Sequence, residues 1–383
     1  MGLRMTGTVI GWWVYTLTDS ALALGLVGLS EVVAALSLAL YAGHYIDRNE
    51  NRGLLLRCII LYMCCIIVFF FLSDASLVQM KPWTIASLIF LVIAATGAIR
   101  AFSGPTFSAL ISKIVPKNIL PAATTISSGT WLTGSIMGHA LGGFCIAIFG
   151  IHYTFLVVLL FVISGYLLLR KLTPKAVNVH HEQNTWQSVK EGIEYVFKTK
   201  EILGAITLDL FAVLFGGAVA MVPIFAKDIL HVGPQGFGWL NAATDIGAIV
   251  TVTLLTLYPL ERKQGKWLFY SIAGFGICII VFALSKTFWL SFLALMLSGS
   301  MDGVSVVIRS TILQLKTPES LKGRVMSVNS MFINSSNELG QFESGLAAKL
   351  MGIVPSVVFG GFMTIGVVIA TWFKAPDLRK MEY

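Results

Sequence analysis

Several side chains that can exchange a proton or hold a polar ligand lie inside long apolar runs, and six of them are our main candidates. They are Glu31, Arg100, Asp302, Arg309, Glu338 and Gln341. A charged group inside a membrane is costly, so it is retained where it pairs with another group or lines a water-filled path. A carboxylate moved away from water binds a proton more readily, and an arginine can hold that carboxylate or an anionic ligand. We therefore predict that these residues serve proton coupling or line a substrate cavity.

Among these candidates, Glu31 with Arg100 is our first choice for proton coupling, and Asp302 or Glu338 is the second. Helical spacing aligns polar residues on one face of two runs. One face carries Ser298, Asp302, Ser305 and Arg309, and the other carries Ser330, Asn334, Glu338, Gln341 and Gly345. Such stripes should line an aqueous cavity. In the alternative reading they join helices to one another, and Asp302 neutralises Arg309.

Other residues in the apolar runs are secondary candidates for a functional role. Asp209 and Glu343 lie toward the ends of their runs, where we expect structural roles. A flat ligand could stack on an aromatic ring, although lipid-facing or core positions are the more common use of such rings. The rings considered are Trp12, Trp13, Tyr15, Phe102, Phe107 and Trp131.

The composition indicates an integral membrane protein. Of 383 residues, 56% are hydrophobic and only 12% are charged, about half the share of charged residues in soluble domains. The mean hydropathy is +0.82. The five cysteines lie inside apolar runs with no CxxC pair, so we expect no metal site, and no cofactor motif is visible.

The apolar runs number twelve, and each of them except the first is long enough to span a bilayer. They cover 3–17, 21–45, 54–73, 83–112, 121–149, 151–170, 202–226, 236–258, 267–285, 287–314, 325–350 and 353–373. The first run is short, so we expect helix 1 to be truncated at its N-terminus. The sequence thus predicts an all-α membrane protein of two six-helix bundles.

A polar segment separates the two sets of six runs. It covers 171–200 and includes an amphipathic pattern in which Trp186, Val189, Ile193 and Val196 or Phe197 recur at helical spacing, as in an interfacial helix. We therefore expect an N-terminal bundle over 1–170, a cytoplasmic linker over 171–200 and a C-terminal bundle over 201–383.

The basic residues predict the orientation in the membrane. With both termini inside, only four of the 27 Lys and Arg residues fall in outer segments, namely Lys81, Lys227, Lys286 and Lys349. Arg4, Arg100 and Arg309 lie within spans, and all others are on the inner side. The net charge of +8 is therefore a topology signal, and we expect no nucleic-acid partner.

Three local patterns have unusual composition. The loop after the second run reads GHYIDRNENR, with Gly43, Asp47, Arg48 and Arg52. The fourth run carries Arg100, Ser103 and Gly104. The fifth run carries glycines at i, i+4 and i+8, which favours close helix packing; its set is Gly134, Gly138, Gly142 and Gly143, with His139 among them.

Two sets of six spans with these three patterns resemble the major facilitator superfamily over nearly the whole chain. In that resemblance the loop is a cytoplasmic latch, in which Gly43 permits close helix approach and the charges of Asp47, Arg48 and Arg52 meet helix ends or opposite charges. The fourth-run pattern resembles Arg-x-x-polar-Gly of proton antiporters. The fifth-run pattern resembles the exporter motif G-x-x-x-G-P-x-x-G-G, with His139 in place of Pro.

A finer resemblance exists to the subfamily of siderophore exporters and drug–proton antiporters that includes the enterobactin exporter. It is carried by GWWVYTLTDSALALGLVGLSE (11–31) and NELGQFESGLAAKLMG (337–352). It implies a monomeric secondary transporter of the bacterial inner membrane that exports a small amphipathic or catecholate compound in exchange for protons.

Alternative functions remain at this stage. They are macrolide or drug efflux without a siderophore role, uptake, and a non-transporting or truncated superfamily protein. The sequence has no GxxxxGK[ST], HExxH or GxSxG motif, so an ATP motor or a hydrolytic enzyme is not supported, and we expect no enzymatic activity.

Overall fold

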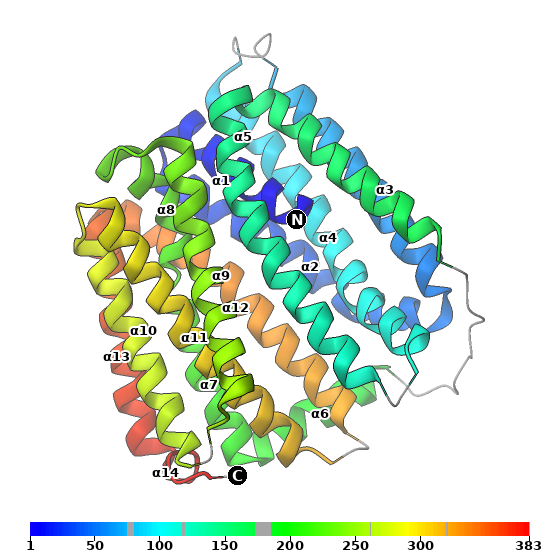
Figure 1. Ribbon diagram of the computed structural model, residues 1–383, viewed down its shortest axis with the longest axis vertical. Coiled ribbons are helices and arrows are strands. Elements are labelled where there is room, and N and C mark those ends of the chain that lie inside the picture. Colours follow the sequence, from blue (N-terminus) through cyan, green and yellow to red (C-terminus); the bar gives the residue numbers. More distant parts are fainter. Residues whose placement is uncertain (75–79, 117–118, 173–184, 261, 319–320, 383) are drawn as a thin grey trace. The chain divides into compact units, whose positions relative to one another are not determined.

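The computed structural model describes residues 1–74, 80–116, 119–172, 185–260, 262–318 and 321–382, and these residues form helices with no strand among them. The helices of residues 1–172 are α1 (Gly2–Thr18), α2 (Ala21–Arg48), α3 (Asn51–Leu72), α4 (Pro82–Ile114) and α5 (Leu120–Arg170) (Figure 1). The helices of residues 185–382 are α6 (Thr185–Lys198), α7 (Lys200–Phe215), η2 (Ala218–Met221), α8 (Val222–Ile224), η3 (Phe225–Ile229), α9 (Gly233–Leu257), α10 (Gln264–Leu284), α11 (Phe288–Lys316), α12 (Lys322–Met351), α13 (Ile353–Lys374) and α14 (Pro376–Arg379).

The predicted membrane helices are present. Within the described ranges, 9 helices are long and apolar enough to cross a membrane. One of them contains Gly150 at φ 72° and ψ 174°, outside the helical region, so α5 is two helices joined at one residue. The short α1 and the more polar α12 complete the twelve predicted runs. The prediction of an all-α membrane fold is confirmed.

The described helices form two compact units. Unit 1 contains Met1–Asp19, Leu29–Thr185 and Gly233–Gly238, and unit 2 contains Ser20–Gly28, Trp186–Val232 and Trp239–Tyr383. These limits differ from the predicted bundles 1–170 and 201–383 in two short segments and in α6, which belongs to unit 2. Residues 173–184 of the predicted linker lie outside the described residues.

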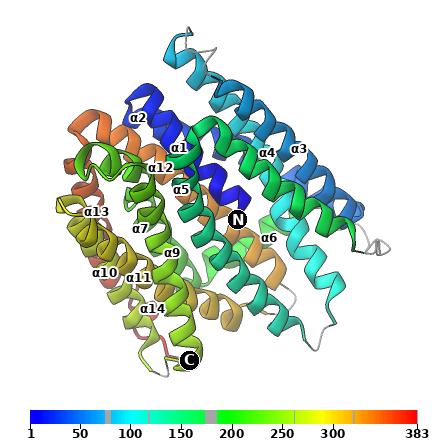
Figure 2. The ribbon, with the colours of Figure 1, turned by 45° about the horizontal axis from the view of Figure 1, so that its top comes forward.

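In unit 1, α3 packs against α4 and α5, and α1 packs against α5 (Figure 2). Aromatic side chains fill the contact between α1, α3 and α5. The ring of Phe155 stacks on Phe69 with centroids 5.6 Å apart, and Trp13 meets it edge-on at 5.8 Å. Trp13 and Tyr15 are therefore core residues, which removes them from the set of rings considered for a flat ligand.

A glycine determines how closely α4 approaches α2 in unit 1. A Cβ at Gly97 would collide with the backbone of Glu31. Only a residue without a side chain lets the two backbones lie this close. Arg100 follows Gly97 by almost one helical turn, so this contact brings Arg100 to the level of Glu31.

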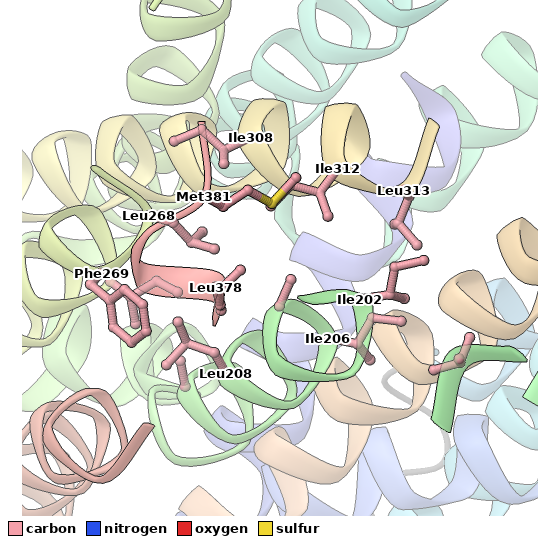
Figure 3. Close-up of a cluster of buried hydrophobic side chains, with 14 of the residues drawn as sticks. Ile202, Ile206, Leu208, Leu268, Phe269, Ile308, Ile312, Leu313, Leu378 and Met381 are labelled. Carbon is pink, nitrogen blue, oxygen red and sulfur yellow. The ribbon is translucent and has the colours of Figure 1, made fainter. Parts of the chain in front are cut away.

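The core of unit 2 lies where α7, α10 and α11 meet. Figure 3 shows Ile202, Ile206 and Leu208 of α7 facing side chains of α10 and α11. Leu378 of α14 is fully buried in the same cluster, so the end of the described chain packs into the unit.

The amphipathic helix α6 docks on unit 2. Val196 is 1% exposed, whereas Ile193 and Phe197 remain exposed. Glu191 forms an ion pair with Arg324 in the first turn of α12, and the Tyr195 hydroxyl donates to the carbonyl of Lys316, the last residue of α11, at 2.5 Å. The predicted helix thus bridges the ends of α11 and α12. The side chains of Trp186 and Val189 lie outside the described residues.

Replacing Gly97 with Ala should lower the thermal stability of the purified protein. Overpacking a close contact costs about 1–3 kcal/mol, and the new methyl group would meet the Glu31 backbone. Gly104→Ala on the same helix is the matched control, because nothing described lies within 4 Å of its Cβ position. Equal melting temperatures for the two variants would contradict this account of the α2–α4 contact.

Replacing Glu191 with Ala should loosen α6. Loss of its pair with Arg324 is worth about 1 kcal/mol, so amide exchange over 190–198 should accelerate roughly fivefold. Hydrogen–deuterium exchange with mass spectrometry measures this. Glu194→Ala is the control, because its pair with Lys198 is exposed at 3.9 Å. Identical exchange in both variants would show that the Arg324 pair does not hold the helix.

Candidate functional site

The first candidate pair, Glu31 and Arg100, is brought together in unit 1. Nη1 of Arg100 lies 2.6 Å from Oε1 of Glu31. The side chains of Arg100 and Glu31 keep 44% and 21% of their surface exposed, respectively, so the pair faces open space and is not sealed in the core. A ligand or a proton can reach such a pair without unfolding of the helices around it. The role in proton coupling stays a prediction.

Two polar neighbours of this pair were missed from the sequence. Tyr62 of α3 interacts electrostatically with Glu31 and Arg100, and its side chain is hydrogen-bonded to Thr96 of α4. Thr96 in turn donates to the carbonyl of Ile93 at 2.8 Å. Tyr62 lies in an apolar run with no polar stripe around it, so only the packing of α3 on α4 identifies it.

The glycines of α5 pack against two different helices. Gly138 and Gly142 face α1, where added Cβ atoms would meet Arg4 and Thr8 at 2.8 and 3.1 Å. Gly143 faces Gly238 of the short segment Gly233–Gly238. The exporter-type pattern therefore serves close packing in this structure.

His139, which replaces the proline of that pattern, bonds across helices. Its Nδ1 lies 2.8 Å from Oγ1 of Thr8 on α1. One of its ring nitrogens is therefore engaged inside unit 1.

The loop predicted to act as a latch is a tight corner between α2 and α3. Glu50 accepts from the backbone N–H groups of Arg52 and Gly53 at 3.0 and 2.6 Å and so caps α3. Arg52 donates to the carbonyl of Arg170 at the end of α5, 2.7 Å away. That bond is the helix-end contact expected of a basic residue here.

No described atom lies within 4 Å of the Cβ position of Gly43, and the close helix approach expected at this glycine stays a prediction. The side chains of Asp47 and Arg48 lie outside the described residues, and their part in a latch stays a prediction.

In unit 2, Arg309 of α11 pairs with Asp209 of α7, and both side chains are 6% exposed. The alternative in which Asp302 neutralises Arg309 is therefore wrong. Residues seven apart on one helix are separated by about 10 Å along its axis, so Asp302 is too far along α11 to share this contact. Asp209 was expected to be structural, and a buried pair agrees with that expectation.

A cavity of about 280 Å³ lies beside this pair. Side chains of α7, α11 and α12 line it, namely Asp209, Val213, Asp302, Val306, Arg309, Ser310, Leu313, Asn329, Ile333 and Asn337. The predicted polar stripe of α11 contributes only part of this lining. Asp302 and Arg309 line this cavity, whereas Ser298 and Ser305 are each 1% exposed and do not contribute to its lining. A role of the stripe in transport stays a prediction.

The polar residues of α12 are engaged with each other and with a neighbouring segment. Gln341 donates to Glu338 at 3.2 Å, and Glu338 is 6% exposed. A Cβ at Gly28 of the segment Ser20–Gly28 would touch both the Glu338 carbonyl and the Gln341 side chain. Gly345 lies against Gly25 in the same way. This face of α12 therefore serves packing in unit 2.

Among the aromatic candidates, Trp131 and Phe107 remain exposed, at 55% and 47%. The guanidinium of Arg4 lies 5.2 Å from the centre of the Trp131 ring, a cation–π distance. Trp12 is buried and packs on Phe237 of unit 1. Phe102 packs edge-on against Tyr41 and Tyr45 of α2.

Comparisons with known proteins agree with this architecture. The crystal structure of a point mutant of the nucleoside transporter NupG superposes with a TM-score of 0.77 at 14% identity, over 97% of this chain and 96% of that one. The enterobactin exporter EntS of Citrobacter koseri is 22% identical over 70% of this chain and 64% of its own length. A Na⁺, Li⁺, K⁺/H⁺ antiporter of Planococcus maritimus is 20% identical over 93% of this chain and 89% of its own.

The sequence profile of one family covers the molecule from end to end. It is described as "transmembrane secretion effector" and matches residues 1–383. With the helical architecture and these relatives, the match identifies the chain as a multi-pass membrane transporter. The chain belongs to the transmembrane secretion effector family of the major facilitator superfamily.

Proposed function

We propose that this transporter exports a small amphipathic or catecholate compound from the cytoplasm in exchange for protons. We place it in a bacterial inner membrane with both termini on the cytoplasmic side, acting as a monomer. The partly exposed Glu31–Arg100 pair is the observation that carries the proposal. The similarity to an enterobactin exporter supports the substrate class, and the similarity to a cation/H⁺ antiporter supports exchange.

In this mechanism, substrate and proton compete for the Glu31 carboxylate. The ionised carboxylate is held by Arg100 at 2.6 Å and can accept hydrogen bonds from the hydroxyl groups of a catechol. A proton on Glu31 removes one acceptor oxygen and weakens its attraction to Arg100. Loading of a proton from the outside therefore releases substrate, and release of that proton inside restores the binding form.

Arg100 supplies the positive charge beside Glu31 in the substrate-binding state. Its guanidinium offers several N–H donors in a fixed plane, so it can hold the carboxylate and still donate to a catechol or carboxylate oxygen of the ligand. A lysine at this position would supply the charge without this geometry. Transport should therefore depend on the shape of this side chain as well as its charge.

Drug or macrolide efflux uses the same pair with a different ligand. The exposed ring of Trp131 under Arg4 would suit a flat or apolar ring system. Flux measured with each class of compound separates the two substrate proposals.

Everted membrane vesicles acidified inside should lose part of their pH gradient when enterobactin is added. Protons then leave as substrate enters, and a pH-quenched dye reports the change. Arg100→Ala should lower the initial rate at least about tenfold, since a charge-assisted hydrogen bond is worth about 1.5–3 kcal/mol, and Arg100→Lys should fall between.

Three comparisons complete the vesicle assay. Glu194→Gln, on the exposed face of α6, should match the wild-type protein. A macrolide response without an enterobactin response would favour the drug alternative. Equal rates in the wild type and Arg100→Ala would reject the pair as the coupling site.

Substrate binding should release a proton from the purified wild-type protein. In weakly buffered detergent solution, a pH indicator should record acidification on adding enterobactin, because substrate displaces the proton from Glu31. Glu31→Gln cannot hold that proton and should give no signal. Glu343→Gln is the control, because it removes another acid of the apolar runs outside this pair. Proton release from Glu31→Gln at the wild-type level would place the exchange elsewhere.

A further inference from the structure

The cavity of unit 2 has a charge that its own walls do not balance. Three ionisable side chains line it, namely Asp209, Arg309 and Asp302. Asp209 and Arg309 neutralise each other in a pair that is 6% exposed on both sides. The carboxylate of Asp302 is left with no hydrogen bond or ion pair from the described residues that surround it. The ionised cavity thus carries one net negative charge.

Uncharged oxygen and nitrogen atoms complete the polar lining. Asn329 and Asn337 on α12 contribute side-chain amides, and Ser310 on α11 contributes a hydroxyl. Amide and hydroxyl oxygens coordinate hard cations, and they accept hydrogen bonds from an ammonium group equally well. The remaining walls are Val213, Val306, Leu313 and Ile333, so a short apolar substituent can also be held.

The charges select against an anionic ligand. Arg309 is the single basic residue in the described lining of this cavity, and its charge is taken up by Asp209. An anion entering the cavity would meet the uncompensated Asp302. A cation would meet the same carboxylate with favourable sign in a setting where charges are weakly screened. At about 280 Å³, the space exceeds the roughly 30 Å³ share of one water molecule and admits a partly hydrated ion or a small amine.

We propose that this cavity binds one small cation, with Asp302 as its counter-charge and Asn329, Asn337 and Ser310 as neutral ligands. The cation is an alkali-metal ion or the ammonium group of a small amine, which share this chemistry. The Asp209–Arg309 pair forms a fixed wall of the site. Cation binding itself does not depend on the proposed function. Only the role of the cation rests on it, because in a transporter such a cation is a second coupling ion or part of the cargo.

Thermal unfolding of the purified full-length protein tests the proposal. A ligand that binds only the folded state raises the melting temperature in a saturable way. LiCl, NaCl, KCl and methylammonium chloride are each titrated at constant ionic strength against N-methyl-D-glucamine chloride, a bulky cation that serves as the reference. We expect a saturable rise with at least one small cation. A rise in melting temperature with alkali-metal ions only, or with methylammonium only, would identify which kind of cation the cavity binds.

Variants locate the binding. Asp302→Asn should weaken the apparent affinity at least about tenfold, because a charged contact becomes a neutral one. Glu343→Gln, an acid of α12 outside the cavity lining, should leave the affinity unchanged. If Asp302→Asn does not fold, the Asn337→Ala variant is measured in its place. Weaker cation binding by Asn337→Ala would support the site, and unchanged binding would overturn it.

Two further results overturn the proposal, and neither bears on export. One is a wild-type protein that no small cation stabilises beyond N-methyl-D-glucamine. The other is an Asp302→Asn variant stabilised as strongly as the wild type. The measurement is an equilibrium without flux, so its failure leaves the vesicle result intact. Likewise, vesicles without enterobactin exchange would reject the proposed function while cation binding could still be observed.

Discussion

Close backbone contact at glycine is the constraint on which the rest of this structure depends. Between membrane helices the hydrophobic effect provides little attraction, since lipid is as apolar as the side chains, so association comes from tight packing and internal polar bonds. Gly97 against Glu31 and Gly138 against α1 are such contacts in unit 1. In unit 2, Gly247 and Gly299 bring α9 and α11 together, each against the backbone of the other helix. In unit 1, the Gly97 contact brings Arg100 to the level of Glu31.

Each unit holds an arginine–carboxylate pair inside its predicted apolar runs, with opposite outcomes. Arg100 and Glu31 stay partly exposed, whereas Arg309 and Asp209 are almost sealed. An exposed pair can change partners at small cost, because water or a ligand replaces what is lost. A sealed pair cannot, because a single charge left behind in the interior is strongly unfavourable. This contrast is why we assign exchange chemistry to the first pair and a fixed structural wall to the second.

Much of the fold was predictable from the sequence because it depends on apolar length. The twelve runs, including the boundary at Gly150 inside α5, follow from hydropathy and a single glycine. Glu31 with Arg100 was predictable as well, since a charge in an apolar run needs a partner. The partner of Arg309 was not, because Asp209 lies 100 positions away and only the packing of α7 on α11 selects it over Asp302. The burial of Ser298 and Ser305 was missed for the same reason. Helical periodicity predicts which residues share a face of the helix, but it does not predict which other helix packs on that face.

The sealed pair of unit 2 also bears on how this chain can change over evolutionary time. Losing either Asp209 or Arg309 alone leaves an isolated ion among apolar side chains, whereas replacing both with apolar residues of similar volume is often neutral or even stabilising. The two positions are therefore expected to drift together, through concerted exchange of both residues and not through single steps. Glu31 and Arg100 are partly exposed, so the loss of one of them does not leave a buried unpaired charge. Joint retention of these two residues would therefore reflect selection on transport.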